Sequence, residues 1–224
     1  MPGPFATYPD TFTSWLRAAN QDAWDAMVGH RFCRDMASDI PQDVLVRYLR
    51  YEHAFVRAAI TIFAHALTKA PAADQTRLVA VLHALATEQE DYFRDTFAAL
   101  GLGADLLPED ALPPGARGLR DGVLGIATQH GYAEILSSIL AAEWMYWTWC
   151  SEAKSHGKPK QTLAAAWIDL HVEPDFSDQV AWLRNRVDAL GPKLPPERQV
   201  LCAKLFARVL KLEIAFHDAP YRPL

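Results

Sequence analysis

The sequence predicts an all-α protein, a single-domain helical bundle that covers residues 1–224. Three observations predict it. Apolar side chains recur at intervals of three and four residues, which places them on one face of an α-helix. No stretch shows the alternation of apolar and polar residues typical of a half-buried strand. Most connections are short and none has linker composition, which favours one domain over two.

Capping residues and Gly or Pro breaks mark where each expected helix begins and ends. A loop rich in Gly and Pro is expected at Leu102–Pro114. The expected helices are Asp10 (as N-cap) through Trp24, Pro41 to Lys69, Asp74 to Gly101, 116–129, 132–155, 162–171, Asp175 (as N-cap) to Gly191, and Pro195 through Phe216.

Composition limits the partners and the compartment. The formal net charge of -5 and the absence of a basic run give no support for nucleic-acid binding. The apolar stretch Ile135–Ala142 is too short to span a membrane, and the first five residues lack the features of a secretory signal. The three cysteines have no metal-type spacing, and their odd number suggests a reducing compartment. We therefore expect a cytoplasmic protein without nucleic-acid or membrane partners.

One carboxylate, Glu143, stands in the most aromatic helical segment of the chain, 140–149. Tyr146 follows three residues later on the same helical face. Burial of an unpaired carboxylate is costly, and the usual relief is a polar partner or a raised pKa. Such a group can transfer protons near neutral pH. The alternative is that Glu143 lies on an exposed stripe between the indoles.

Two further acids stand in similar surroundings. Glu52 lies beside aromatic residues in a long helix, and Glu213 lies in an apolar run of the last helix. Together with Glu143, these acids could converge on a pocket between helices. A pocket of this kind would suit acid/base chemistry on a polar heteroaromatic ligand, whose ring the aromatic residues would stack. For each acid, an exposed position is the alternative.

A metal site receives little support. A helical di-metal carboxylate site needs Glu-x-x-His pairs on two helices. The chain instead has Glu213-x3-His217 and His171-x3-Asp175, and Pro174 interrupts the second pair. We expect neither a metal nor a cofactor.

Five motifs, in order along nearly the whole chain, resemble those of one family. They are Trp24…His30-Arg-Phe32, Tyr48-Leu-Arg-Tyr-Glu-His-Ala-Phe55, Gly131-Tyr132, Trp167-Ile-Asp-Leu-His-Val-Glu-Pro-Asp-Phe176 and Leu212-Glu-x-x-Phe216…Tyr221. The family is TenA/THI-4, the thiaminase-II-like proteins, and the resemblance implies their haem-oxygenase-like helical fold.

The chain departs from the better-known branch of this family, which has Cys-x-x-x-Tyr in the central helix with cysteine as nucleophile. Counting back four residues from Tyr146 gives Ala142, so that cysteine is absent. Glu143 is one residue beyond that register, about 100° around the helix. It resembles a second branch, in which a glutamate takes over from the cysteine. Three other positions differ from the first branch: Glu52 replaces an aspartate that holds the aminopyrimidine, and Phe55 and His171 replace tyrosines.

The resemblance implies hydrolysis of an aminopyrimidine or formamidopyrimidine breakdown product in thiamine salvage. Glu143, Glu213 and Tyr146 would then be catalytic: as general base, as proton donor to the leaving amine, and as the group that orients Glu143 or the substrate. Glu52, Phe55 and His171 would bind the substrate. The family commonly forms homodimers or homotetramers, and we expect the same here. Two alternatives stay open: a non-haem di-metal oxygenase, and a non-catalytic ligand-binding or regulatory protein.

Overall fold

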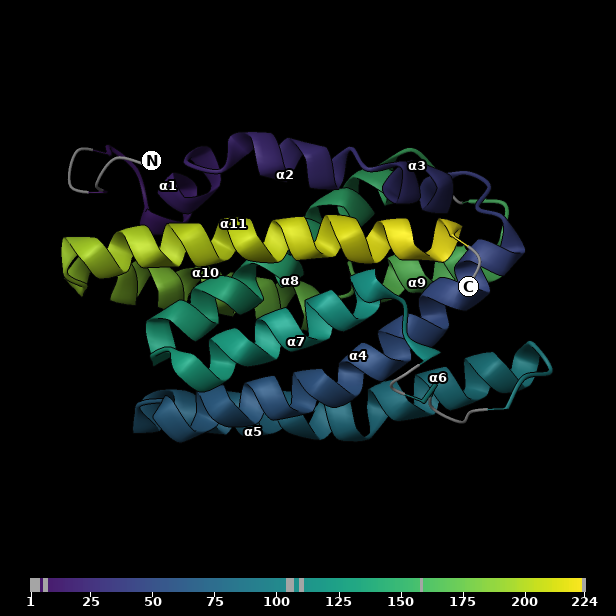
Figure 1. Ribbon diagram of the computed structural model, residues 1–224, viewed down its shortest axis with the longest axis horizontal. Helices are drawn as coiled ribbons and strands as arrows, with labels where there is room; N and C mark the ends of the chain where they lie inside the picture. Colours follow the sequence, from purple (N-terminus) through teal and green to yellow (C-terminus); the bar gives the residue numbers. More distant parts are fainter. Residues whose placement is uncertain (1–4, 6–7, 104–106, 109–110, 158, 223–224) are drawn as a thin grey trace. The chain divides into compact units, whose positions relative to one another are not determined.

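The computed structural model describes residues 5, 8–103, 107–108, 111–157 and 159–222. These residues form helices and no strands, which confirms the all-α prediction (Figure 1). The chain packs as two compact units. The first consists of residues up to Pro41 together with Ala133–Ile214, and the second of Gln42–Tyr132 together with Ala215–Leu224. A single domain over residues 1–224 stays a prediction.

The first unit contains the helices at the two ends of the chain and the aromatic helix α8. Its helix α1 packs against α10, where the backbone N–H and the hydroxyl of Thr13 donate to the carboxylate of Asp188 at 2.7 and 3.2 Å. Its elements are α1 (Phe12–Ala18), α2 (Gln21–Val28), α3 (Arg31–Ala37), α8 (Tyr132–Ser155), α9 (Thr162–Leu170), α10 (Pro174–Leu190), the 3₁₀ turn η3 (Gly191–Lys193) and α11 (Pro196–Asp218) as far as Ile214.

The prediction of one helix from Asp10 through Trp24 is wrong, because the helix breaks after α1. Thr11, not Asp10, is the N-cap, and its hydroxyl accepts from the N–H of Ser14 at 3.3 Å. At the break, the Asn20 amide donates to the carbonyl of Leu16 at 2.8 Å and to that of Ala203 at 3.1 Å. Side-chain bonds of this kind compete with the helical ladder. Ala203 lies far away in the sequence, so local pattern could not predict this break.

Helix α8 has the bounds expected from the sequence, 132–155, and is buried along most of its length. Its first turn carries Glu134, which is 2% exposed and accepts two hydrogen bonds from the guanidinium of Arg198 at 2.7 and 2.8 Å. The hydroxyls of Ser137 and Ser138 donate to backbone carbonyls one turn earlier. The buried polar residues in the first half of α8 therefore form hydrogen bonds inside the protein, as buried polar groups generally do.

The second unit is built on the long helix α4, with α5 and α7 beside it (Figure 1). Near its middle, the buried His53 ring stacks on Phe93 at 4.8 Å and contacts the carboxylate of Glu90 at 3.2 Å. The elements of this unit are α4 (Gln42–Lys69), α5 (Ala72–Ala86), α6 (Glu88–Ala99), α7 (Pro114–Gln129), the end of α11 and the 3₁₀ turn η4 (Ala219–Tyr221).

The expected helix from Asp74 to Gly101 is in fact two helices, α5 and α6, which meet at Thr87. Its hydroxyl donates to the carbonyl of His83 at 2.7 Å, and its backbone leaves the helical region. Gly101 ends α6 as predicted: its φ of 69° suits glycine, and the N–H of Leu102 bonds the carbonyl of Phe97 at 2.8 Å.

Three helix starts differ slightly from expectation. Helix α5 begins at Ala72, since the buried carboxylate of Asp74 accepts from the Tyr132 hydroxyl at 3.0 Å rather than capping the helix. Helix α10 has Glu173 at its N-cap position, with Pro174 in its first turn, and α7 begins at Pro114. Proline suits the first turn of a helix because the N–H that it lacks would have no partner there. In the described part of the chain, no helix has both the length and the apolar character needed to cross a membrane.

The ion pair between Glu134 and Arg198 gives the first prediction. We expect Arg198→Met to lower the free energy of unfolding by about 2–3 kcal/mol, because it leaves the buried Glu134 without its cation. Arg94→Met is the matched control, since Arg94 pairs with Asp91 while both are more than half exposed; it should cost under about 1 kcal/mol. Urea unfolding of both variants measures the difference, and equal losses would contradict the prediction.

Candidate functional site

Glu143 lies in the middle of α8 among buried residues and keeps only part of its surface accessible. Among the described residues, no hydrogen bond or ion pair reaches its carboxyl group. Burial raises the pKa of Glu143 to about 7. Its carboxyl group is therefore partly protonated at neutral pH, and it can either accept or donate a proton.

The contacts of the neighbouring Trp144 fix the rotation of α8 about its own axis. Its ring lies 4.9 Å from that of Trp24 in an edge-to-face arrangement. The guanidinium of Arg184 lies 4.5 Å from the centroid of the same ring. Successive side chains on a helix point about 100° apart. The fixed position of Trp144 thus determines the direction in which Glu143 leaves the helix.

Tyr146 stacks on His171, which comes from the end of α9. The ring centroids are 5.0 Å apart and the planes are 27° from parallel. Nδ1 of His171 lies 2.8 Å from the carbonyl oxygen of Trp167. Because a carbonyl oxygen can only accept, Nδ1 carries the proton and Nε2 is the acceptor in the neutral ring. Burial lowers the pKa of His171 to about 4, so the ring is neutral at pH 7.

Aromatic side chains enclose the His171 ring on several sides. Trp167 lies at 4.4 Å and Phe176 at 4.8 Å between centroids, in addition to Tyr146. The sequence predicts no site role for Trp167 or Phe176, although both stand in one of the motifs that resemble the family. For Trp167 the spacing is a signal, because its carbonyl stands one helical turn before His171 and can accept the ring N–H.

Glu213 lies on α11 in the same unit and is 1% exposed. Its charge acts on the thiol of Cys33 in α3, which in turn acts on Cys150 in α8, one turn after Tyr146. The first interaction indicates that Glu213 lies near Cys33 of α3. Burial, the main cause, raises the pKa of both thiols well above neutral. Neither cysteine is therefore a ready nucleophile.

The two remaining predicted site residues belong to the second unit. Glu52 lies on α4 with 9% of its surface exposed. Phe55, one turn later, is half-buried, and its ring lies 6.5 Å from that of Phe216. Glu143, Tyr146, His171 and Glu213 thus share one unit, whereas Glu52 and Phe55 share the other. A common pocket for all six residues stays a prediction.

No group of three or more His, Cys, Asp or Glu side chains is placed to hold a metal ion in the parts of the chain that the structure describes. The sequence expectation of no metal stays a prediction.

The chain belongs to the TENA/THI-4/PQQC family, whose sequence profile matches residues 17–222. No curated protein matches the chain in sequence.

Solved structures show the same fold as this chain, at low sequence identity. A TenA homologue from Pyrococcus furiosus has a TM-score of 0.86 and 18% identity, over 94% of this chain and 100% of that one. A TenA family transcription regulator from a Silicibacter species has a TM-score of 0.82 and 19% identity, over 95% and 97%. A proposed TenA-like thiaminase from Sulfolobus solfataricus has a TM-score of 0.78 and 14% identity, over 92% and 94%. The all-α, haem-oxygenase-like fold expected from the resemblance is therefore confirmed.

Burial of Glu143 should cost stability. Because its folded-state pKa is raised, the carboxylate destabilises the fold as pH rises from about 4.5 to 7, and the penalty is complete above that range. We expect Glu143→Gln to raise the free energy of unfolding at pH 8 by about 2–3 kcal/mol, and by much less at pH 5. Glu152→Gln changes an exposed acid on the same helix and should have little effect at either pH. Denaturant unfolding at the two pH values checks this, and a destabilised Glu143→Gln variant at pH 8 would contradict it.

His171 should make the protein sensitive to acid. Its folded-state pKa is lowered, so the unfolded chain binds a proton first, and stability falls as pH drops from about 6.5 to 4. Between pH 7 and pH 5, we expect the free energy of unfolding to fall by about 1–2 kcal/mol more in wild type than in His171→Gln. His156→Gln, at an exposed position, is the control. An unchanged pH dependence in His171→Gln would show that the ring is not held neutral.

Proposed function

We propose that this protein is a hydrolase of thiamine salvage that acts on an aminopyrimidine or formamidopyrimidine breakdown product. Membership of the family and the thiaminase-like relative support a thiamine-related role. One observation carries the chemical part of the proposal. The carboxyl group of Glu143 has a pKa of about 7, and no described residue forms a hydrogen bond or ion pair with it.

Catalysis begins with Glu143 as general base. Its carboxylate removes a proton from water while the water oxygen bonds to the carbon that carries the leaving nitrogen. Glu213 donates a proton to that nitrogen as the carbon–nitrogen bond breaks, and ammonia or an amine leaves. Such a division of labour requires two carboxyl groups whose surroundings separate their pKa values. Tyr146, one turn after Glu143, orients that carboxylate or the substrate.

Substrate binding uses the aromatic surroundings of His171. Tyr146, Trp167 and Phe176 present ring faces and edges suited to a flat heteroaromatic ring. Nε2 of His171 accepts a hydrogen bond from an N–H of the substrate, because Nδ1 holds the only ring proton. Glu52 bonds the amino edge of the pyrimidine and Phe55 completes the apolar wall.

Substitution of Glu143 tests the mechanism. We expect Glu143→Gln to lower turnover at least about a hundredfold while aminopyrimidine binding is kept, because glutamine fills the same space and cannot accept the proton. Ammonia or formate release measures turnover, and calorimetry measures binding.

Two further readouts make that test specific. Glu152→Gln should retain full activity, and in wild type kcat/KM should rise as pH passes about 7, where Glu143 ionises. Hydrolysis that persists in Glu143→Gln would refute the role of this residue.

A non-catalytic regulator is the second candidate, since one relative on this fold is named a transcription regulator. The same assays separate the two: a regulator binds the pyrimidine and releases neither ammonia nor formate. The di-metal oxygenase alternative is tested by metal analysis of protein purified without chelator. As the family resemblance implies, we also propose a homodimer or homotetramer in the cytoplasm, which sedimentation and cell fractionation would test.

A further inference from the structure

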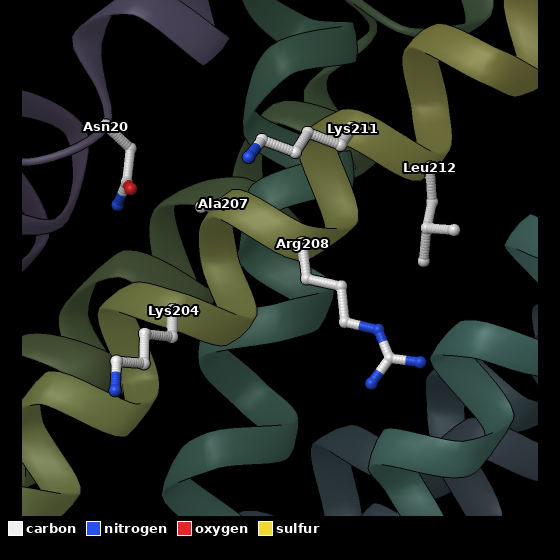
Figure 2. A pocket seen from close by; sticks show the side chains of 6 residues that line it. All are labelled: Asn20, Lys204, Ala207, Arg208, Lys211 and Leu212. Atoms are coloured by element: carbon white, nitrogen blue, oxygen red, sulfur yellow. The ribbon is translucent and has the colours of Figure 1, made fainter.

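A basic groove of about 440 Å³ lies along α11 (Figure 2). It is lined by Asn20, at the break between α1 and α2, and by five residues of α11: Lys204, Ala207, Arg208, Lys211 and Leu212. All six residues belong to the first unit. None of them has a role in the proposed hydrolysis.

The three cations of the groove have no acidic partner in the part of the chain that the structure describes. Among the described residues, no ion pair or hydrogen bond reaches Lys204, Arg208 or Lys211, and all three are exposed. They stand four and three residues apart along one helix, close enough for their like charges to repel. The chain as a whole is acidic, with a net charge of -5. The positive charge of the groove is therefore a local feature, and an anionic ligand would relieve the repulsion.

Asn20 adds a fixed polar group to the groove. Its amide nitrogen donates to the carbonyls of Leu16 and Ala203, and the second bond ties it to α11 itself. Figure 2 shows Lys204 and Lys211 extending on the side of α11 that faces Asn20, whereas Arg208 extends on the other side. Ala207, between the lysines, leaves the floor of the groove open. The two ammonium groups and the amide therefore border one space.

The spacing of the lysines indicates the size of the ligand. Lys211 stands seven positions after Lys204, which is about 10 Å along the helix axis. A ligand with one small anionic group can pair fully with one lysine, whereas two linked anionic groups can reach both. We propose that this groove binds a small molecule that carries two linked anionic groups, such as a diphosphate. Arg208, with a long flexible stem, strengthens the binding from the opposite side.

This ligand differs in chemical class from the pyrimidine. The proposed hydrolytic site has the carboxyl group of Glu143 and the aromatic rings around His171, which do not suit a polyanion. The groove therefore serves a second ligand, and the inference does not depend on the proposed hydrolysis.

Calorimetry with inorganic pyrophosphate tests the proposal at about 0.15 M salt, where nonspecific attraction is screened. We expect saturable binding of one pyrophosphate per chain, and weaker binding of inorganic phosphate. The double variant Lys204→Gln/Lys211→Gln should weaken pyrophosphate binding about a hundredfold and Arg208→Gln about tenfold, as expected for lost charge-assisted contacts.

Lys193→Gln is the matched control, because Lys193 is an exposed lysine of the same unit outside the groove. It should bind pyrophosphate like wild type, and circular dichroism should show all variants folded. The proposal is overturned if pyrophosphate does not saturate, if the double variant binds normally, or if Lys193→Gln loses as much affinity. Binding of phosphatidylserine vesicles without pyrophosphate binding would also overturn it, in favour of a membrane surface.

Discussion

The burial of α8 is the constraint on which the first unit depends. A helix that is apolar on most sides must be covered by other elements, and side chains from α2, α9, α10 and α11 meet it. Any polar group on such a helix needs a partner inside the protein or must change its ionisation. Arg198 supplies such a partner, because its guanidinium donates to the carboxylate of Glu134. Arg184 and His171 instead cover aromatic rings of α8.

Two acids on α8 meet the cost of burial in opposite ways: one has a charged partner, and the other has a raised pKa. Glu134 is paired with a guanidinium that approaches both carboxylate oxygens, so its charge is compensated and it stabilises the packing of α8 against α11. Glu143 has no such partner among the described residues, and its pKa rises instead. A carboxyl group in this state costs stability and is available for proton transfer. Functional groups commonly combine these two properties.

The fold alone does not determine this chemistry. Relatives with the same helices differ from this chain at more than four residues in five, and one fold can carry catalysis or regulation. The chemical character of the proposed site depends on residues of this chain: an alanine at 142, a glutamate at 143 and a histidine at 171. Nε2 of this histidine is an acceptor, because its only N–H, at Nδ1, donates a hydrogen bond to the carbonyl of Trp167 one turn earlier.

The sequence by itself determined the helical class, the bounds of α8 and the family, because periodicity, Gly and Pro breaks and motif order are all local signals. It also singled out Glu143, since a carboxylate among tryptophans is visible in the sequence. It could not predict the break at Asn20 or the true role of Asp74, because Ala203 and Tyr132, their partners, are distant in the chain. Nor could it assign a pKa near 7 to Glu143 or a tautomer to His171. It also could not show that two lysines and an arginine line one groove without an ion-pair partner among the described residues. Those properties arise from desolvation and from contacts between helices, which exist only after the chain has folded.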